Sequence, residues 1–257
     1  MFLCARNDGG LLMDVIHKID VNHKIKEITE TWGADFTGVA DLSLAHEAIL
    51  TQGGPMIAAY PLAISVGIGL RHAIVDQLPN RANRAVALSY QYHSYDLINQ
   101  RLDLLISQVS RFLQRVGHRA LPISASKQID NERICAAFSH KMAAHLAGLG
   151  WVGKSCLLVT PEMGPRVRWA TVLTDAPLQI TGEPTEARCG DCNLCVEICP
   201  VHAFTGEPFR VSEPRGKRYD AGVCERYFAE MREKDEGLAV CGLCLYVCPH
   251  GMRQCRN

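Results

Sequence analysis

The sequence predicts an α+β protein, with an α/β-type domain and a mixed sheet over residues 1–180 and a small cysteine-rich module over residues 181–257. Strand patterns alternate with helical patterns over the first part, as in chains that pack helices against a sheet. Most of the 12 cysteines lie in the second part, whose irregular pattern is too short for a core of its own. The segment Pro177–Arg188, PLQITGEPTEAR, has the composition of a connector between the two.

The composition is that of a globular protein, with 47% hydrophobic and 21% charged residues in a chain of 257. Its 27 basic and 27 acidic residues cancel, so the chain has no general electrostatic preference for a polyanion. The N-terminus lacks the basic flank and long apolar run of a secretory signal. Glycines and prolines interrupt the uncharged stretch 48–70, which is not typical of a spanning helix. We therefore expect a cytoplasmic protein with no membrane segment.

Helices and strands alternate in the first third of the chain. Asp14–Trp32 has apolar residues at helical spacing, and Gly33 follows as a C-terminal stop. Phe36–Ala40 is typical of a short strand, and Leu42–Leu50 of a short helix. Leu62–Leu70 predicts a buried strand, whose glycines allow the close approach of another backbone or of a ligand.

The clearest helical pattern is Ser94–Val116. Its apolar residues recur at spacings of three and four and form a core-facing stripe: Ile98, Leu102, Leu105, Val109, Phe112 and Val116. Leu121–Ser124 predicts a strand, and the alanine-rich Asn131–Ala147 predicts a helix. Leu157–Thr160 and Val167–Thr174 flank a glycine-containing turn, so we expect them to pair as a β-hairpin.

Four cysteines in the segment Cys189–Pro200, CGDCNLCVEICP, follow the spacing C-x2-C-x2-C-x3-C-P. This spacing is that of bacterial-type ferredoxins with two 4Fe–4S clusters, in which the fourth cysteine binds the other cluster. The pattern therefore predicts a second group of cysteines. Cys241–Pro249, CGLCLYVCP, supplies it by repeating the C-x2-C-x3-C-P half of the pattern. We thus expect a ferredoxin-like C-terminal module.

Each predicted cluster takes ligands from both segments. We assign one 4Fe–4S cluster to Cys189, Cys192, Cys195 and Cys248, and the other to Cys199, Cys224, Cys241 and Cys244. Cys224 fills the place of the missing first ligand, although Cys255 is also near in sequence. Metal–thiolate bonds would then supply much of the folding energy of this module.

A zinc ribbon and a disulfide framework are the alternatives for these cysteines. Zinc sites built from C-x2-C pairs need only four ligands and rarely carry the third step or the trailing proline. Disulfides need an oxidising compartment, and no export signal indicates one. Four cysteines are left over and are expected to be buried or idle thiols: Cys4, Cys135, Cys156 and Cys255.

A glycine-rich turn, AGLGWVGK, precedes the cysteines. Gly148, Gly150 and Gly153 let a helix end, turn and pass close to another group. Trp151 can stack on a flat cofactor, and Lys154 can reach an anion. The alternative is a tight helix-to-strand turn in which Trp151 fills the core. Composition alone favours this second interpretation.

These residues resemble the epoxyqueuosine reductase family and its relatives among the reductive dehalogenases. The resemblance rests on AGLGWVGK, an LLVT strand, a glycine turn, TVLTDAPL and both cysteine segments, and it covers about Tyr92–Pro249. It implies two 4Fe–4S clusters in a ferredoxin-like module, packed on an α/β domain that holds a base-off cobalamin. Electrons from an external donor of the ferredoxin or flavodoxin type would then reach cobalt, which does the reductive chemistry on the substrate.

The resemblance also implies roles for particular residues. The corrinoid side of the site would be lined by Gly148, Gly150, Trp151, Gly153 and Lys154. His93, in YHSYD, matches a tyrosine–histidine position near the cofactor.

The proton donor is where the chain departs from the family. The family has an aspartate in a Val-Asp-Ser-Ala-Pro stretch, whereas the equivalent strand here, Pro122–Ser126, has none. Asp130 in the following segment is one candidate for the role. His140 is the other, because a histidine beside the glycine turn can donate a proton or bind metal. The alternative for His140 is a hydrogen-bonded residue between helix and sheet.

The leading hypothesis is an iron–sulfur oxidoreductase of the epoxyqueuosine reductase type, with cobalamin, that reduces a small-molecule or modified-nucleoside substrate. Net charge zero and the lack of a helical-repeat domain after Pro249 make tRNA a doubtful partner. One alternative is an electron-transfer protein or reductive activator of a corrinoid protein, with no substrate of its own. Another is a structural iron–sulfur module. A corrinoid-sized cleft beside Gly148–Lys154 favours the first, and a shallow surface favours the second.

Overall fold

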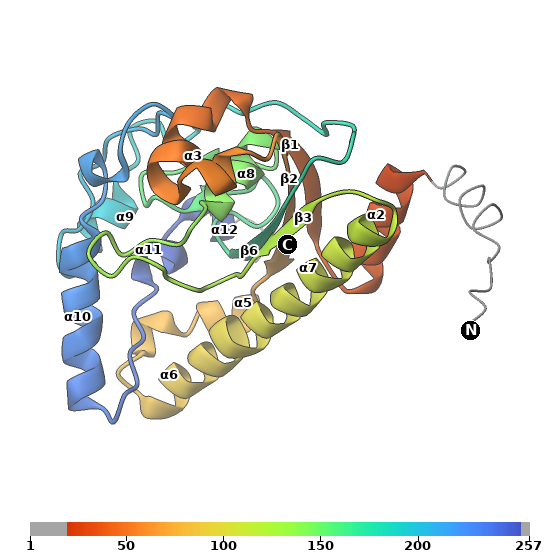
Figure 1. Cartoon of the computed structure of the whole chain (residues 1–257). Helices are drawn as coiled ribbons and strands as arrows, with labels where there is room; N and C mark the ends of the chain where they lie inside the picture. The colour runs from red at the N-terminus through yellow and green to blue at the C-terminus, as the bar shows by residue number, and fades with distance from the viewer. Residues whose placement is uncertain (1–19, 253–257) are drawn as a thin grey trace, which may run out of the picture.

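A four-stranded sheet with helices on both faces forms the centre of the computed structural model, which describes residues 20–252 (Figure 1). The strands lie in the order β1-β2-β6-β3 and comprise β1 (Phe36–Asp41), β2 (Leu62–Gly69), β3 (Ala120–Ile123) and β6 (Val167–Thr174). Every pair is antiparallel, so the expectation of a mixed sheet was wrong. An alternation of helices and strands in the sequence does not fix the strand direction. A helix can also connect two antiparallel strands at the same end of the sheet. The fold is α+β.

Two helical layers cover the two faces of the sheet. On β2, Ile64 and Val66 face the cluster that contains α7 (Leu97–Arg115), whereas Ala63 faces α8 (His140–Leu146). This alternation is the two-residue period of a strand. The remaining helices of the first part are α2 (Val21–Thr31), α3 (His46–Gly53), α4 (Pro55–Ala58), α5 (His72–Val75) and α6 (Arg84–Gln91), with short 3-10 turns at Ser43–Ala45 and Leu78–Asn80. Four residues of the expected apolar stripe, Ile98, Leu102, Leu105 and Val109, are buried in the core, Phe112 is half-buried, and Val116 lies after the end of α7.

The helix expected from Ser94 begins earlier in the chain. α6 starts at Arg84, where the Asn83 side chain caps it by accepting from Ala85 N–H at 2.9 Å. A π-helical segment, η3 (Tyr92–Asp96), joins α6 to α7 without a break. π-Helical turns inside α-helices occur frequently at functional sites.

The helix expected over Asn131–Ala147 is wrong for its first half, because only His140–Leu146 is helical. Residues 124–139 instead form a loop that is fixed by side-chain contacts. Arg133 pairs with Asp130 at 2.6 Å and also donates to the carbonyl oxygens of Thr51 and Gln52 on α3. These tertiary contacts override the helical preference of the sequence.

The expected hairpin also pairs differently. β5 (Leu158–Val159) pairs with β4 (Trp151–Val152), while β6 pairs with β2 over eight residues and with β3 on its other edge. The short β4–β5 ladder closes the glycine-rich turn. The longer β6 strand takes the centre of the sheet because both of its faces are buried.

The C-terminal part contains α9 (Leu194–Glu197), η4 (Arg215–Lys217), α10 (Ala221–Lys234), α11 (Leu243–Tyr246) and α12 (Pro249–Met252). Figure 1 shows α9, α10 and α11 together at one side of the sheet. Leu238, Val240 and Leu245 belong to the same buried cluster as Leu78 and Tyr90, so this part adds to the core of the first. The domain boundary at residue 180 stays a prediction.

Some of the predicted features fall outside residues 20–252. The start of the helix expected from Asp14, and the cysteines Cys4 and Cys255, lie outside the described residues. Within residues 20–252, no helix is both long and apolar enough to cross a bilayer.

Candidate metal centre

Two short helices bring the cysteine segments together. α9 carries Cys195 and α11 carries Cys244, and the two helices are in contact. Cys192 N–H donates to the Cys189 carbonyl oxygen at 3.0 Å, which closes a turn before α9. Pro249, the last residue of the second segment, starts α12, a position where proline is favoured. Thiols that are distant in sequence therefore meet in one region.

The first thiol group comprises Cys189, Cys192, Cys195 and Cys248. Burial, together with the nearby thiols of the other three, raises the pKa of Cys195 to about 11. Burial also raises the pKa of Cys248, and Cys189 and Cys192 add to this shift. Neighbouring thiolates have this effect only at short range. These shifts agree with the predicted grouping of Cys248 with three cysteines of the other segment, and the wiring itself stays a prediction.

The second thiol group comprises Cys199, Cys224, Cys241 and Cys244. Burial strongly raises the pKa of Cys244, and the other three thiols of the group raise it further. The pKa of Cys224 is raised by burial and, beyond that, by Cys241 and Cys199. Cys195 of the first group also contributes to the shift of Cys244, so the two groups adjoin.

Two adjoining groups of four thiols are the donor set that two 4Fe–4S clusters need. The described part of the chain contains ten cysteines, and all are free thiols. Within the same part, no three His, Cys, Asp or Glu side chains gather closely enough to hold a single metal ion. A cubane cluster holds its thiolates at separate corners, so its ligands are spaced more widely than those of one ion. The donor set fits the clusters, and the role of each ligand stays a prediction.

The glycine-rich turn is filled by the protein's own packing. Gly148 has a φ of 76° and follows α8 as its C-terminal stop. A Cβ at Gly150 would lie 2.2 Å from the Val159 carbonyl oxygen. Trp151 is 1% exposed, and its ring centroid is 4.9 Å from that of His250. These contacts are those of the tight helix-to-strand turn, and they do not form an open cradle for a corrinoid.

The end of this turn contacts the first cysteine segment. The Lys154 ammonium donates to the Gly190 carbonyl oxygen and to Asn193 Oδ1, both at 2.9 Å. A Cβ at Gly153 would lie 3.6 Å from Cys189 Sγ. Lys154 therefore holds the loop of the first thiol group and Gly153 lies close to it, which is a different role from the corrinoid contact that the resemblance implied.

His93 lies on the π-helical segment. Its side chain is exposed, and its ring is edge-on to that of Tyr92 with centroids 5.1 Å apart. Among the described residues, no hydrogen bond or ring contact joins His93 to Gly148–Lys154. A corrinoid role for His93 stays a prediction.

His140 is a hydrogen-bonded residue between α8 and the sheet. Its Nδ1 is 2.8 Å from Thr171 Oγ1, and its Nε2 is 3.0 Å from the Ser124 carbonyl oxygen. Nε2 must therefore carry the hydrogen that it donates to Ser124, and Nδ1 accepts from Thr171. Burial lowers the pKa of His140 to about 4. A neutral imidazole with both nitrogens engaged is a poor proton donor, so the geometry disfavours the predicted catalytic role.

Asp130 is part of the loop structure. Its carboxylate accepts from the backbone N–H groups of Glu132 and Arg133 and pairs with the Arg133 guanidinium. These hydrogen bonds with Arg133 lower the pKa of Asp130. A carboxyl group held in its ionised form is a weak acid catalyst, so this candidate is disfavoured as well.

Sequence reasoning missed a basic and aromatic shell around the second thiol group. Lys141 Nζ donates to the Cys156 carbonyl oxygen at 2.5 Å, and burial lowers the pKa of this lysine. Burial raises the pKa of the Tyr219 phenol, and the Cys224 side chain adds to this shift. Arg218 is only 5% exposed. Nothing in the cysteine spacing indicates these residues, because the fold supplies them from other segments.

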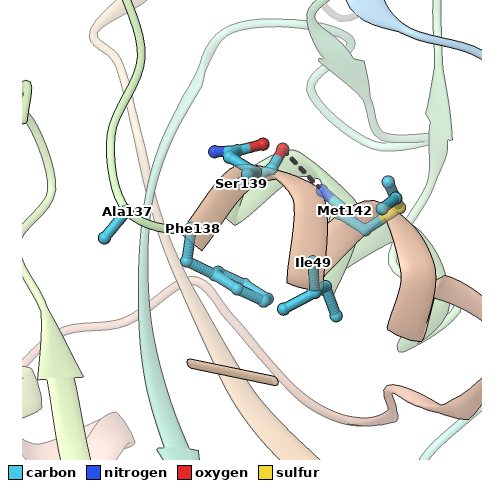
Figure 2. A pocket seen from close by; sticks show the side chains of 7 residues that line it. Ile49, Ala137, Phe138, Ser139 and Met142 are labelled. Carbon is cyan, nitrogen blue, oxygen red and sulfur yellow. Dashed lines mark hydrogen bonds between the residues drawn. The ribbon is translucent and has the colours of Figure 1, made fainter. Parts of the chain in front are cut away.

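A small cavity lies between α3 and the start of α8 (Figure 2). Figure 2 shows the Phe138 ring, Ile49 and Met142 around it, with Ala137 and Ser139 at its rim. Its volume is about 20 Å³, enough for about one water molecule. It is too small for an organic substrate.

A larger, open groove runs between α7 and the loop after β3. Its volume is about 630 Å³, in the range of small-molecule sites. It is lined by Asp96, Asn99, Gln100, Asp103, Leu104, Ser107, Ser126 and Lys127. Asp103 fixes the rim by accepting from the Ser124 hydroxyl and from Ala125 N–H. The carbonyl of Ser124 is the acceptor of His140, so the groove is connected to α8.

Comparison with known proteins gives matches to both parts of the chain. Residues 188–251 match the family described as a 4Fe-4S double cluster binding domain. The epoxyqueuosine reductase of Pseudomonas aeruginosa is 32% identical over 188 residues, which are 71% of this chain and 48% of that protein. That of Synechococcus sp. is 31% identical over 202 residues, 73% of this chain and 56% of that protein. The chain thus spans about half the length of the curated relatives that it matches.

Solved structures with the same fold include members of two enzyme classes. A catabolic reductive dehalogenase matches with a TM-score of 0.59 and 20% identity, over 88% of this chain and 31% of that chain. An epoxyqueuosine reductase, solved with an epoxyqueuosine-modified tRNA stem loop, matches with a TM-score of 0.55 and 17% identity. The second match covers 92% of this chain and 66% of that chain. At these identities the likeness shows a shared fold.

Proposed function

Because the chain belongs to the epoxyqueuosine reductase-like family, we propose that it is an iron–sulfur oxidoreductase that passes electrons through two 4Fe–4S clusters to a reductive site. The observation that supports the proposal is the meeting of the two cysteine segments, whose helices α9 and α11 are in contact and whose Cys199, Cys224 and Cys244 pack in one cluster. A crossed arrangement of this kind is that of two-cluster ferredoxins, whose role is electron transfer. Residues 181–257 would hold the clusters, and residues 1–180 the acceptor side.

The chain's own residues have definite roles in this proposal. Cys189, Cys192, Cys195 and Cys248 hold one cluster, and Cys199, Cys224, Cys241 and Cys244 hold the other. When bound, these clusters accept and give up single electrons. Lys154 fixes the loop of the first group through Gly190, and Cys199 is the buried member of the second group. An external protein of the ferredoxin or flavodoxin type would be the electron donor.

The proposal also covers the class of substrate. The polar groove beside α7 has the volume and the hydrogen-bonding groups for a small molecule or a modified nucleoside. Relatives named epoxyqueuosine reductase, one of them solved with a tRNA stem loop, support a nucleoside-type substrate. Net charge zero gives this chain little attraction for a whole tRNA, so we propose the nucleoside and not the polyanion as the recognised group.

Cobalamin is the cofactor that the structure supports least. The turn expected to line it is closed, with Trp151 buried and Gly150 against the backbone of β5. This observation favours a second candidate, an electron-transfer protein or a reductive activator of a corrinoid protein. Such a protein would use the same clusters and a docking face, and would need no corrinoid of its own.

Anaerobic reconstitution distinguishes the two candidates. The protein is loaded with iron and sulfide, and about eight irons per chain are expected. It is then incubated with cobalamin, desalted, and examined by absorption and paramagnetic resonance. Retained corrinoid with a Co(II) signal supports the reductase. No retained corrinoid and no Co(II) signal removes the cobalamin-dependent reductase and leaves the electron-transfer protein. A protein that binds no iron contradicts both.

A further inference from the structure

The polar groove beside α7 is lined mainly by hydrogen-bond acceptors. Asp96, Asn99 and Asp103 come from the continuous helix formed by η3 and α7, while Ser126 and Lys127 come from the loop after β3. Residues three, four and seven positions apart share one face of a helix. The groove has a volume of about 630 Å³, so the chemistry of this helix face decides which small molecule it can take.

The two carboxylates of the groove have no cationic partner in the described part of the chain. Asp103 accepts from Ala125 N–H at 2.8 Å and from the Ser124 hydroxyl at 3.0 Å, and both donors are neutral. Asp96 is exposed, and no ion pair within residues 20–252 includes Asp96, Asp103 or Lys127. Two carboxylates and one ammonium line the groove, so its net charge is negative. Charge therefore favours a cationic ligand over an anionic one.

Asn99 provides a second, independent observation. Its side chain lines the groove and is only 9% exposed, and its Oδ1 has no hydrogen-bond partner among residues 20–252. A buried acceptor without a partner destabilises a folded chain, and such groups are rare in proteins. A terminal amide turns easily about its χ2 bond, so Asn99 can present its oxygen to a donor in the groove.

We propose that the groove binds a molecule with a protonated amine, whose ammonium lies between Asn99 Oδ1 and the Asp103 carboxylate. The two residues are four positions apart on one helix, a spacing that places Cβ atoms about 5–6 Å from each other. An ammonium group has three N–H donors and can therefore bond to both side chains at once. Asp96, almost two turns away, adds attraction at longer range.

The inference deepens the proposed function, on which it rests for the role of the groove as the substrate site. It names the chemical class of that substrate: a small molecule or nucleoside that is a cation at neutral pH. A phosphate group would instead meet two carboxylates, which disfavours the backbone of a nucleic acid in the groove.

The test compares two nucleosides that differ in one group. The 5′-amino analogue of adenosine carries an ammonium where adenosine carries a hydroxyl, and calorimetry on the anaerobically reconstituted chain measures both dissociation constants. We expect the amine to bind about tenfold more tightly than adenosine. This preference should disappear when the pH is raised above the pKa of the ligand's amine, because the carboxylates stay ionised while the ligand loses its charge.

Asp103→Asn removes the charge and retains the rim of the groove. The new amide oxygen can accept from Ala125 N–H, and the new NH2 group can donate to Ser124 Oγ. The affinity for the amine should fall about tenfold, and the affinity for adenosine should not change. Glu47→Gln is the matched control, because it removes a carboxylate that is 91% exposed on α3 and should alter neither affinity.

Asn99→Leu separates ligand binding from a structural role. Leucine is similar in size and has no buried acceptor to satisfy, so the free energy of unfolding should not fall, whereas the affinity for the amine should fall about fivefold. A destabilised Asn99→Leu chain with unchanged affinity for the amine would mean a structural role and would overturn the ammonium site.

Three other results overturn the inference: equal affinities for the two nucleosides, no binding of the amine at millimolar concentration, and unchanged affinity for the amine in Asp103→Asn. The proposed function fails in a different way. A chain that prefers the amine as expected but does not bind about eight irons contradicts the iron–sulfur function alone. A fully loaded chain without this preference contradicts the ammonium site alone.

Discussion

The crossed wiring of the thiol groups can be tested with double substitutions for which the two possible wirings give opposite results. In Cys195→Ala/Cys248→Ala, both missing ligands belong to the first group. In Cys244→Ala/Cys248→Ala, one ligand is missing from each group. If each segment instead held its own cluster, the first variant would damage both clusters and the second would damage one.

The expected magnitude follows from the ligand count. A complete chain should bind about eight irons, and a cluster that has lost a thiolate should be lost. We therefore expect about four irons per chain in Cys195→Ala/Cys248→Ala and almost none in Cys244→Ala/Cys248→Ala. Cys135→Ala is the control, since Cys135 lies in the loop after β3 and should leave the full iron content.

Iron and acid-labile sulfide are measured after anaerobic reconstitution and desalting, together with the absorption of the clusters. Circular dichroism of the same samples checks that the first part of the chain stays folded. The reverse pattern, with about four irons in Cys244→Ala/Cys248→Ala and none in the other variant, would refute the crossed wiring. Full iron in both variants would refute the ligand assignment altogether.

Three further predictions concern the first part of the chain. Gly150→Ala should lower the free energy of unfolding, measured by urea denaturation, by about 1–3 kcal/mol, because the new Cβ would lie 2.2 Å from the Val159 carbonyl oxygen. Gly216→Ala is the control: a Cβ at Gly216 would meet no atom within 4 Å, so the free energy of unfolding should change little. His140 has a pKa lowered to about 4 from 6.5, so between these values the unfolded chain binds a proton that the folded chain does not. Stability should then fall by about 3 kcal/mol as the pH drops through this window and stay level above it, and His140→Asn should flatten this slope in urea titrations at several pH values. Asp130→Asn should destabilise the loop, seen as faster proteolysis, yet leave the rate of substrate reduction within about twofold if the carboxylate has no part in proton transfer.

The sequence predicts the local elements of this fold better than their pairing. The stripe of α7 is visible because Leu102, Leu105 and Val109 recur at helical spacing, and the structure buries all three. The strand partners are not visible in this way. Leu158 and Val159 pair with the short strand before them, and this depends on the closure of the glycine turn, which local patterns do not show.

For the candidate site, too, the sequence predicts some residues and not others. The cysteine spacing predicts which thiols gather because the ligand geometry of a cluster is strict. His140 and Asp130 carried no comparable pattern, and their partners, Thr171 and Arg133, decide what they do. Lys141 could be found only from the fold, since nothing in the cysteine spacing indicates its hydrogen bond to the Cys156 carbonyl oxygen.

The apolar residues that flank Cys241 and Cys244 connect the oxidation of the second cluster to the degradation of the protein. Leu238, Val240 and Leu245 belong to the same buried cluster as the α7 residues, and Cys241 and Cys244 lie between Val240 and Leu245 in the sequence. Damage to the second cluster by oxygen would therefore release these side chains from the interior and weaken the whole molecule. Oxidative loss of iron and exposure to proteases should then occur together, so that an inactivated chain is also the one that is degraded.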